Sequence, residues 1–267
     1  IHHDHLPVIL ARRTHVWLIL QGISAQVAFG SLVWLPVLFT ERARDQGYDD
    51  STAVVVGTIF TTLFQLGGAL SIIGGVIGDR LQRRTPRGRA LVAAVGVLGA
   101  LPFYGILFYV PMKISVPHGG SSGEVVAAVL ASVITEPTVA LSLVTAFIAL
   151  AFTSANSPNW FALIGDVNLP EHRGTVYSIG NLVNSLGRAG GNALIGVAAK
   201  ALAGAFPPPL NYAAGLALFQ LFFVPTGVMY WLASRTAPRD IAHVHDTLLA
   251  RAATDQKPAE GTARAPF

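Results

Sequence analysis

Long apolar segments alternate with short polar connectors along most of this 267-residue chain. A helix that crosses the hydrocarbon core of a bilayer needs about 20 mostly apolar residues. Segments of that length predict an all-α membrane protein with six transmembrane helices, a lead-in at residues 1–13 and a tail at residues 234–267. The predicted spans cover residues 14–39, 51–78, 90–111, 137–163, 175–202 and 211–233.

One apolar stretch between the third and fourth spans does not fit this series. Residues 125–134 are too few to cross a hydrocarbon core of about 30 Å. We expect them to form an interfacial or extracellular helix. The alternative is a seventh span, which would move the tail and Arg173 to the other side of the membrane.

Basic residues are distributed unevenly between the two sides that six spans define. Three of them, Arg42, Arg44 and Lys113, fall on one side, and thirteen fall on the other. Because basic connectors favour the cytoplasmic side, we expect an integral protein of the plasma (inner) membrane with both termini in the cytoplasm. The thirteen are residues 12, 13, 80, 83, 84, 87, 89, 173, 235, 239, 251, 257 and 264.

Composition excludes several other classes of protein. Charged residues make up 12% of the chain and hydrophobic residues 52%, whereas a soluble domain has about twice that charged fraction. The formal net charge of +4 comes with basic residues at helix ends, where topology explains them, so we expect no nucleic-acid partner. The chain has no cysteine, which excludes disulfides and thiolate-bound metals.

The sequence also offers little for catalysis or metal binding. His2, His3, Asp4 and His5 form a cluster of possible ligands, but they precede the first span in a polar stretch that lacks the rigid geometry of a metal site. The spans contain no catalytic constellation, and the chain has no P-loop for direct ATP drive. We therefore expect no cofactor and no enzyme, and a membrane enzyme is the third interpretation of the function.

The connector after the second span carries the most specific motif. It matches G-x-x-x-D-R-x-G-R-R, the loop signature of the major facilitator superfamily, and the chain resembles that superfamily in this respect. Gln82 replaces the usual glycine of the signature, so the turn is less permissive there. The matching residues are Gly75, Asp79, Arg80, Arg83 and Arg84.

Two further segments resemble the fifth helix of a superfamily half. Residues 169–174 resemble the P-x-x-R-G connector that opens this helix, and residues 185–196 resemble its glycine-rich face. Asn192 stands where exporters often have proline, so the antiporter hallmark is absent. The connector and the amide-rich helix together are similar to spinster-like lipid and drug exporters.

The resemblance implies half of a transporter, because superfamily transporters have twelve helices in two six-helix halves. We expect the C-terminal half, since the chain begins in a polar stretch without a start methionine and its tail has a composition that fits a disordered cytoplasmic end. The N-terminal half followed by linker is the alternative. The implied partners are the other half, the lipid bilayer and a small-molecule or lipid-like substrate.

The implied function is secondary active transport of a small solute by alternating access. A non-transporting membrane protein of the same fold, receptor-like or a helper subunit, is the alternative. In superfamily transporters the first, second, fourth and fifth helices of each half line the cavity. Gln26, Gln65 and Arg188 lie near the midpoints of three of these predicted helices, and such groups are costly in hydrocarbon.

The fifth predicted helix carries a polar stripe. Asn181, Asn184, Arg188 and Asn192 are spaced three, four and four residues apart, which places them on one helical face. Such a stripe must face water, a substrate or the partner half, although amides also form hydrogen bonds between packed helices. We expect Arg188 to bind an anion, either the substrate or a carboxylate of the other half.

The fourth predicted helix is interrupted by polar residues. Asn156 is a candidate cavity residue, and Pro158 frees a backbone carbonyl and bends the helix. This point is either a gate hinge or a solvated helix end.

The resemblance finally implies a cytoplasmic gate. In the superfamily the loop aspartate, here Asp79, faces the N-terminus of the fifth helix, where the helix dipole favours an anion. We expect a charge network that locks the gate, and the alternative is that the loop arginines only orient the helices. The predicted gate residues are Gly75, Asp79, Arg80, Arg83, Arg84, Asp166, Glu171 and Arg173.

Overall fold

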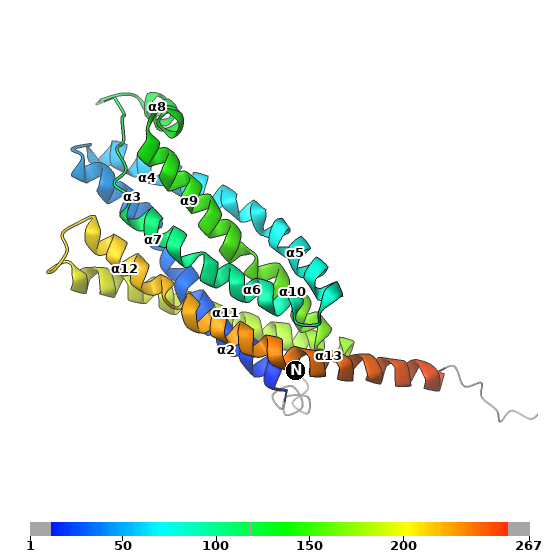
Figure 1. Cartoon of the computed structure of the whole chain (residues 1–267). Coiled ribbons are helices and arrows are strands. Elements are labelled where there is room, and N and C mark those ends of the chain that lie inside the picture. The colour runs from blue at the N-terminus through cyan, green and yellow to red at the C-terminus, as the bar shows by residue number, and fades with distance from the viewer. Residues whose placement is uncertain (1–11, 118, 256–267) are drawn as a thin grey trace, which may run out of the picture.

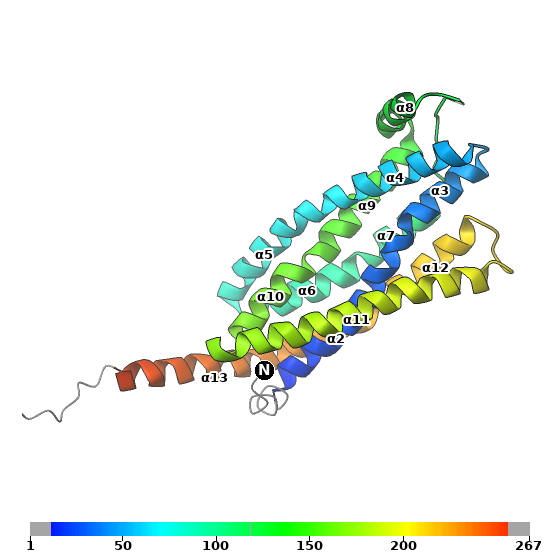
Figure 2. The ribbon, with the colours of Figure 1, turned by 180° about the vertical axis from the view of Figure 1, so that it is seen from behind.

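The computed structural model describes residues 12–117 and 119–255, and every regular element within those ranges is helical. Six helical passes run between the two ends of one elongated bundle (Figures 1 and 2). The connectors after α3, α7 and α11 lie at one end of the bundle. The start of α2 and the connectors after α5 and α10 lie at the other end, from which α13 extends.

The passes correspond to the six predicted segments. The first contains α2 (Arg13–Ser31), the 3-10 helix η2 (Leu32–Trp34) and α3 (Leu35–Asp45). The second contains α4 (Asp50–Leu66), the 3-10 helix η3 (Gly67–Leu70) and α5 (Ser71–Arg84). The third contains α6 (Gly88–Gly99) and α7 (Leu101–Tyr109), and the fourth contains α9 (Pro137–Ser154) and α10 (Asn156–Asp166). The fifth is the single helix α11 (Pro170–Leu202), and the sixth contains α12 (Leu210–Gln220) and α13 (Phe223–Asp255).

Prolines explain where four of the passes break. Proline has no N–H for the carbonyl four residues earlier, and its ring collides with that carbonyl. Pro158 therefore cannot bond to Ser154, and α9 ends at Ser154. The same offset places Pro36, Pro102 and Pro225 four residues after Leu32, Leu98 and Leu221, at the breaks of the first, third and sixth passes.

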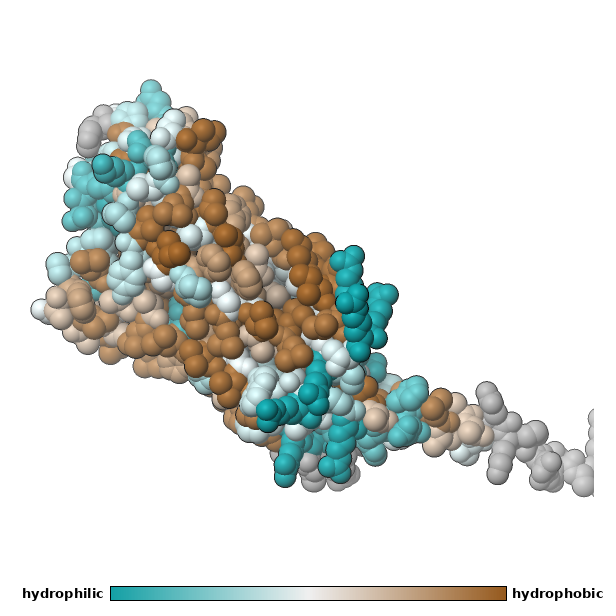
Figure 3. All heavy atoms as spheres, in the orientation of Figure 1, coloured by the Kyte–Doolittle hydropathy of each residue, from teal (hydrophilic) through white to brown (hydrophobic). Residues whose placement is uncertain are grey.

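Within the described ranges, five passes have the length and hydropathy of a membrane span: residues 13–45, 50–84, 88–109, 137–166 and 210–254. On the face that Figure 3 shows, the surface over the middle of the bundle is correspondingly apolar, and hydrophilic groups gather towards its ends. Helix α11 is long enough at 33 residues, but it is not among the candidate spans, since its amides and Arg188 lower its hydropathy. The all-α membrane architecture is thus supported, and a sixth crossing by α11 stays a prediction.

The short apolar stretch between the third and fourth passes forms α8 (Ser122–Thr135), which has 14 residues. It lies across the end of the bundle opposite the N-terminus (Figure 1). Its first turn is closed by Ser121 and Glu124, each of which bonds to the backbone N–H of the other. These bonds hold the pKa of the Glu124 carboxyl below its usual value. Residues 125–134 therefore do not add a bundle-length pass.

The tail differs from its prediction. Residues 234–255 continue the sixth pass as helix α13, so the expectation of a largely disordered tail was wrong for this segment. The helix continues because Val244 is buried, Ile241 packs against a buried apolar cluster, and Arg251 forms an ion pair with Glu171 at 2.7 Å. Residues 256–267 lie outside the described residues.

Candidate functional site

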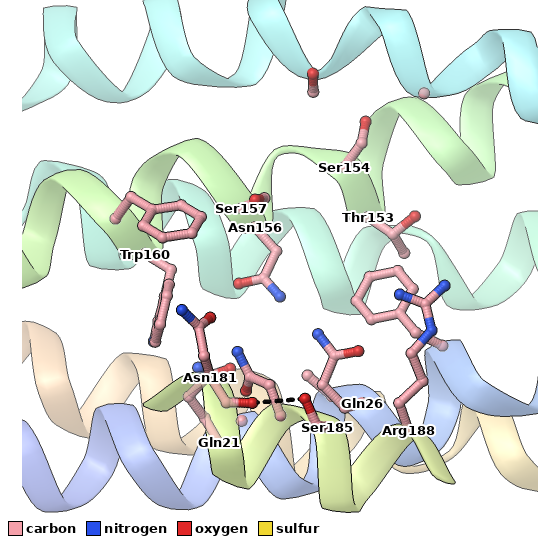
Figure 4. Close-up of a pocket in the computed structure, with 17 residues that line it drawn as sticks. Gln21, Gln26, Thr153, Ser154, Asn156, Ser157, Trp160, Asn181, Ser185 and Arg188 are labelled. Atoms are coloured by element: carbon pink, nitrogen blue, oxygen red, sulfur yellow. Dashed lines mark hydrogen bonds between the residues drawn. The ribbon is translucent and has the colours of Figure 1, made fainter. Parts of the chain in front are cut away.

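A polar cavity of about 590 Å³ lies between the passes of the bundle (Figure 4). Its walls come from α2, from the η3–α5 junction, from the break between α9 and α10, and from α11. These are the first, second, fourth and fifth passes. Its polar lining residues are Gln21, Gln26, Ser71, Thr153, Ser154, Asn156, Ser157, Asn181, Asn184, Ser185 and Arg188.

Close backbone packing positions α11 against α2. A Cβ added to Gly187 would lie 2.7 Å from the backbone oxygen of Ile23, and one added to Gly191 would collide with the backbone of Val27. Small residues four apart permit such an approach between membrane helices. Gly187 and Gly191 form the close contact, or seam, between α11 and α2, and the polar stripe of α11 lies beside it. Asn181, Asn184 and Arg188 therefore line the same cavity as Gln26 of α2.

Arg188 is the one charged residue among the described residues that line the cavity. Its side chain is exposed. Figure 4 shows it rising from α11 beside Gln26, toward the wall that carries Thr153. Among the described residues no carboxylate forms an ion pair with it, so the cavity presents an unneutralised guanidinium.

The wall opposite α11 is held by polar contacts from the sixth and second passes. Asn156 is buried, and its Oδ1 accepts a hydrogen bond from the hydroxyl of Tyr230. Asn159 donates from Nδ2 to the backbone oxygens of Gly74 at 3.0 Å and Ala155 at 2.8 Å. The carbonyl of Ala155, at the helix break, is thus satisfied, and the amide of Asn156 is fixed at the cavity edge.

Aromatic rings form the remaining wall. Phe29, Trp160 and Phe161 line the cavity, and the centroids of the last two rings lie 4.8 Å apart in an edge-to-face arrangement. The indole N–H of Trp160 donates to the backbone oxygen of Leu18 at 3.3 Å. The cavity therefore has a polar side that carries one cation and an apolar aromatic side.

A second polar cluster lies at the end of the bundle where α5 and α6 meet. Arg89 donates to Asp79 Oδ1 from Nη2 at 2.8 Å and forms a second ion pair with Asp166. Gln82 closes this cluster, because its Nε2 donates to Asp166 at 3.3 Å and its Oε1 accepts from the backbone N–H of Arg89 at 3.1 Å. The second, third and fourth passes are joined here through one guanidinium.

The other predicted gate residues divide among different contacts. Arg80, Arg83 and Arg84 are exposed, and no ion pair involves them in the described part of the chain. Glu171 bonds to Arg251, and Arg173 donates from Nε to the backbone oxygen of Asn168 at 3.2 Å. Gly75 faces Pro158, to which an added Cβ would lie 3.3 Å away.

The family model described as Major Facilitator Superfamily matches residues 4–191, which is more than half of the chain. The chain belongs to the major facilitator superfamily. Membership implies an integral membrane protein with a transporter-type function, since superfamily proteins are generally transporters rather than enzymes. A comparison with curated proteins found no match.

Two predicted cavity residues of this superfamily member do not reach the cavity. Asn192 accepts at Oδ1 from the indole N–H of Trp34 at 3.1 Å, which is the contact between helices that we considered as the alternative. Gln65 is exposed and does not line the cavity. The predicted residues that the structure brings together are Gln26, Asn156, Asn181, Asn184 and Arg188.

Sequence reasoning missed several residues of both clusters. Gln21, Thr153, Ser154 and Ser157 line the cavity, and their polarity inside predicted spans was a usable signal. No sequence signal marked the residues of the aromatic wall, because aromatic residues are common in any membrane helix. Arg89 was counted only for topology, since nothing in the sequence distinguishes it from the four other arginines of its connector. The histidines at positions 2, 3 and 5 lie outside the described residues.

Proposed function

We propose that this chain forms one six-helix half of a secondary active transporter, which moves a small solute by alternating access and binds an anionic group of that solute at Arg188. The observation that carries the proposal is the cavity itself, whose lining, in the part of the chain that the structure describes, contains one guanidinium and no acid. Its walls come from the four passes that line the solute path in superfamily transporters.

A cation without a partner is costly inside a membrane. An unpaired arginine at the middle of a membrane costs at least about 2.5 kcal/mol. A guanidinium binds carboxylate or phosphate through two parallel hydrogen bonds, so an anion at this position would offset that cost. The amides of Gln26, Asn181 and Asn184 can donate to or accept from neighbouring groups of the same molecule. A carboxylate of the other half could take this place when the solute is absent.

The aromatic wall narrows the class of solute. A purely ionic solute gains little from Phe29, Trp160 and Phe161, whereas an amphiphile places its apolar part against them. The connector and amide-rich helix that resemble spinster-like exporters support the same class. We therefore propose a small or lipid-like amphiphile with an anionic or zwitterionic head.

Alternating access requires a gate and a flexible point. We propose that the Asp79–Arg89–Asp166 cluster holds the basic end of this half in one state, with that end in the cytoplasm of a plasma (inner) membrane. The break at residues 154–156 would allow α10 to tilt against α9, because Pro158 removes a helical hydrogen bond there. The other half would close the side on which Arg188 is exposed.

The test of the proposed function starts with purified protein and a panel of amphiphilic anions and zwitterions. A solute that raises the unfolding temperature is then assayed for transport in proteoliposomes that contain the complete transporter. We expect Arg188→Ala to abolish both the thermal shift and transport. The Arg188→Lys variant should show little thermal shift and little transport, because the forked geometry of the guanidinium is lost.

Lys200 provides the matched control, because it is a second cation of α11 and does not line the cavity. Lys200→Ala should keep both readouts. Wild-type transport by the Arg188→Ala protein would assign Arg188 a structural role and remove the proposed site. Reading the gene on both sides of this chain tests the half-transporter, since six further spans upstream would fit a C-terminal half.

A further inference from the structure

The outer surface of the bundle carries a second hollow that the proposed function does not use. It is a groove of about 420 Å³ between α5 and α6, with α9 as its floor. We refer to it as the α5–α6 groove. Its lining is apolar and includes Ile73, Ile77, Leu81, Leu91, Val95 and Ala151.

Glycines on both walls bring α9 close enough to form this floor. A Cβ added to Gly96 of α6 would lie 2.6 Å from the backbone oxygen of Phe152, and one added to Gly74 of α5 would collide with Ala155. The groove is therefore fixed by backbone packing and does not depend on the rotamer of one side chain.

The walls of the groove are open toward the surroundings of the bundle. Ile73, Ile77 and Val95 are 54%, 47% and 63% exposed. Aliphatic groups exposed to this extent are unfavourable in water and favourable against acyl chains. In an integral membrane protein, lipid tails are the expected occupants of such a surface.

Cations mark one end of the groove. On α5, Arg80 follows Ile77 by three residues and Arg84 follows Leu81 by three, so both continue the helical face that lines the groove. On the other wall, Arg87 precedes Leu91 by four residues. Figure 3 shows hydrophilic groups directly beside the apolar surface where α5 and α6 meet.

These cations are not neutralised by the protein. Both aspartates of this cluster, Asp79 and Asp166, form their ion pairs with Arg89. In the described part of the chain no ion pair involves Arg80, Arg84 or Arg87, and all three are exposed. The groove therefore ends at a group of cations without carboxylate partners.

We propose that the α5–α6 groove binds one anionic phospholipid from the membrane leaflet at this end of the bundle. One acyl chain lies between α5 and α6, and the phosphate of the head group lies among Arg80, Arg84 and Arg87. Charge complementarity selects the head group, because a basic residue near the surface attracts anionic lipid and leaves a zwitterionic head group nearly unaffected. The groove adds a shaped apolar contact that a basic connector alone would not have.

The test titrates the purified full chain with phosphatidylglycerol or with phosphatidylcholine of identical acyl chains, and native mass spectrometry counts the bound lipid. We expect one phosphatidylglycerol to be retained per chain in preference to phosphatidylcholine. Replacing Arg80 and Arg84 with glutamine should weaken phosphatidylglycerol binding about fivefold for each arginine. The same replacements at Arg235 and Arg239, two exposed arginines of α13, should leave it unchanged.

The groove is tested separately from the charge. Ala151→Phe fills its floor, and Val95→Trp fills it from the exposed wall if the first variant does not fold. Either should reduce phosphatidylglycerol binding although every arginine is present. Val144→Phe is the control, since Val144 is exposed on α9 two turns away from Ala151. Equal retention of the two lipids, or full binding by a folded groove-filling variant, would overturn the proposal.

Discussion

Asp79 of α5 and Asp166 of α10 bind the same guanidinium, that of Arg89 at the start of α6. The signature aspartate therefore contacts the third pass, and no hydrogen bond or ion pair in the described residues joins it to α11. Its partner is an arginine ten positions further along the chain. This one guanidinium connects α5, α6 and α10 at the basic end of the bundle.

The first prediction concerns that shared guanidinium. Asp79→Asn and Arg89→Gln should both slow transport, with little loss of folded protein in the membrane, and Arg89→Gln should do so at least as strongly, because it also removes the ion pair with Asp166. The double variant should be no slower than Arg89→Gln alone, because that change already removes the partner of Asp79. Transport rates normalised to the amount of folded protein measure this coupling.

Arg83→Gln is the control for this cycle, since Arg83 is exposed and has no ion pair in the described residues. If Arg83→Gln slows transport as much as Arg89→Gln, only the total charge of the connector matters. Additive effects of Asp79→Asn and Arg89→Gln would likewise contradict a shared interaction.

The second prediction concerns the seam between α2 and α11. Gly191→Ala should destabilise the protein by about 1–3 kcal/mol, because the added Cβ would collide with the backbone of Val27. Gly190→Ala makes the same change one residue earlier, where an added Cβ meets nothing within 4 Å. Thermal unfolding in detergent compares the two. Equal unfolding temperatures of the two variants would show that the seam does not limit stability.

The third prediction concerns topology. The chain has no cysteine, so single cysteines can be introduced without removing any. Cysteines at Ser121 and Arg87 should react with an impermeant thiol reagent from opposite sides, the first from outside and the second from inside. Reaction of both from one side would contradict the six-span assignment, because the third pass lies between these two positions.

The sequence predicts most of the bundle because its signal is local. Apolar segments of spanning length mark the passes, and Pro158 marks the break of the fourth pass. The polar stripe of α11 can also be recognised in the sequence, because Asn181, Asn184 and Arg188 follow helical periodicity. Helical periodicity does not identify the partner of each residue. It therefore does not distinguish Asn192, which bonds to Trp34, from the residues that line the cavity.

Gln82 shows the same limit at the charge cluster. As a replacement of glycine it indicated only a less permissive turn. In the structure it is helical, and its amide bonds to both Asp166 and the backbone of Arg89. Such a role depends on α10, which lies more than 80 residues away in the sequence, and no local pattern contains that information.

A polar solute path along α11 requires that the cavity be filled with water, and adjacent residues of α11 test this without knowledge of the solute. Asn181 lines the cavity, whereas Leu182 is 62% exposed and does not line it. In membranes that contain the transporter, we predict that Asn181→Cys reacts rapidly with a charged methanethiosulfonate reagent and that Leu182→Cys reacts much more slowly. Equal rates at the two positions, or no reaction at Asn181→Cys, would contradict a polar solute path along α11.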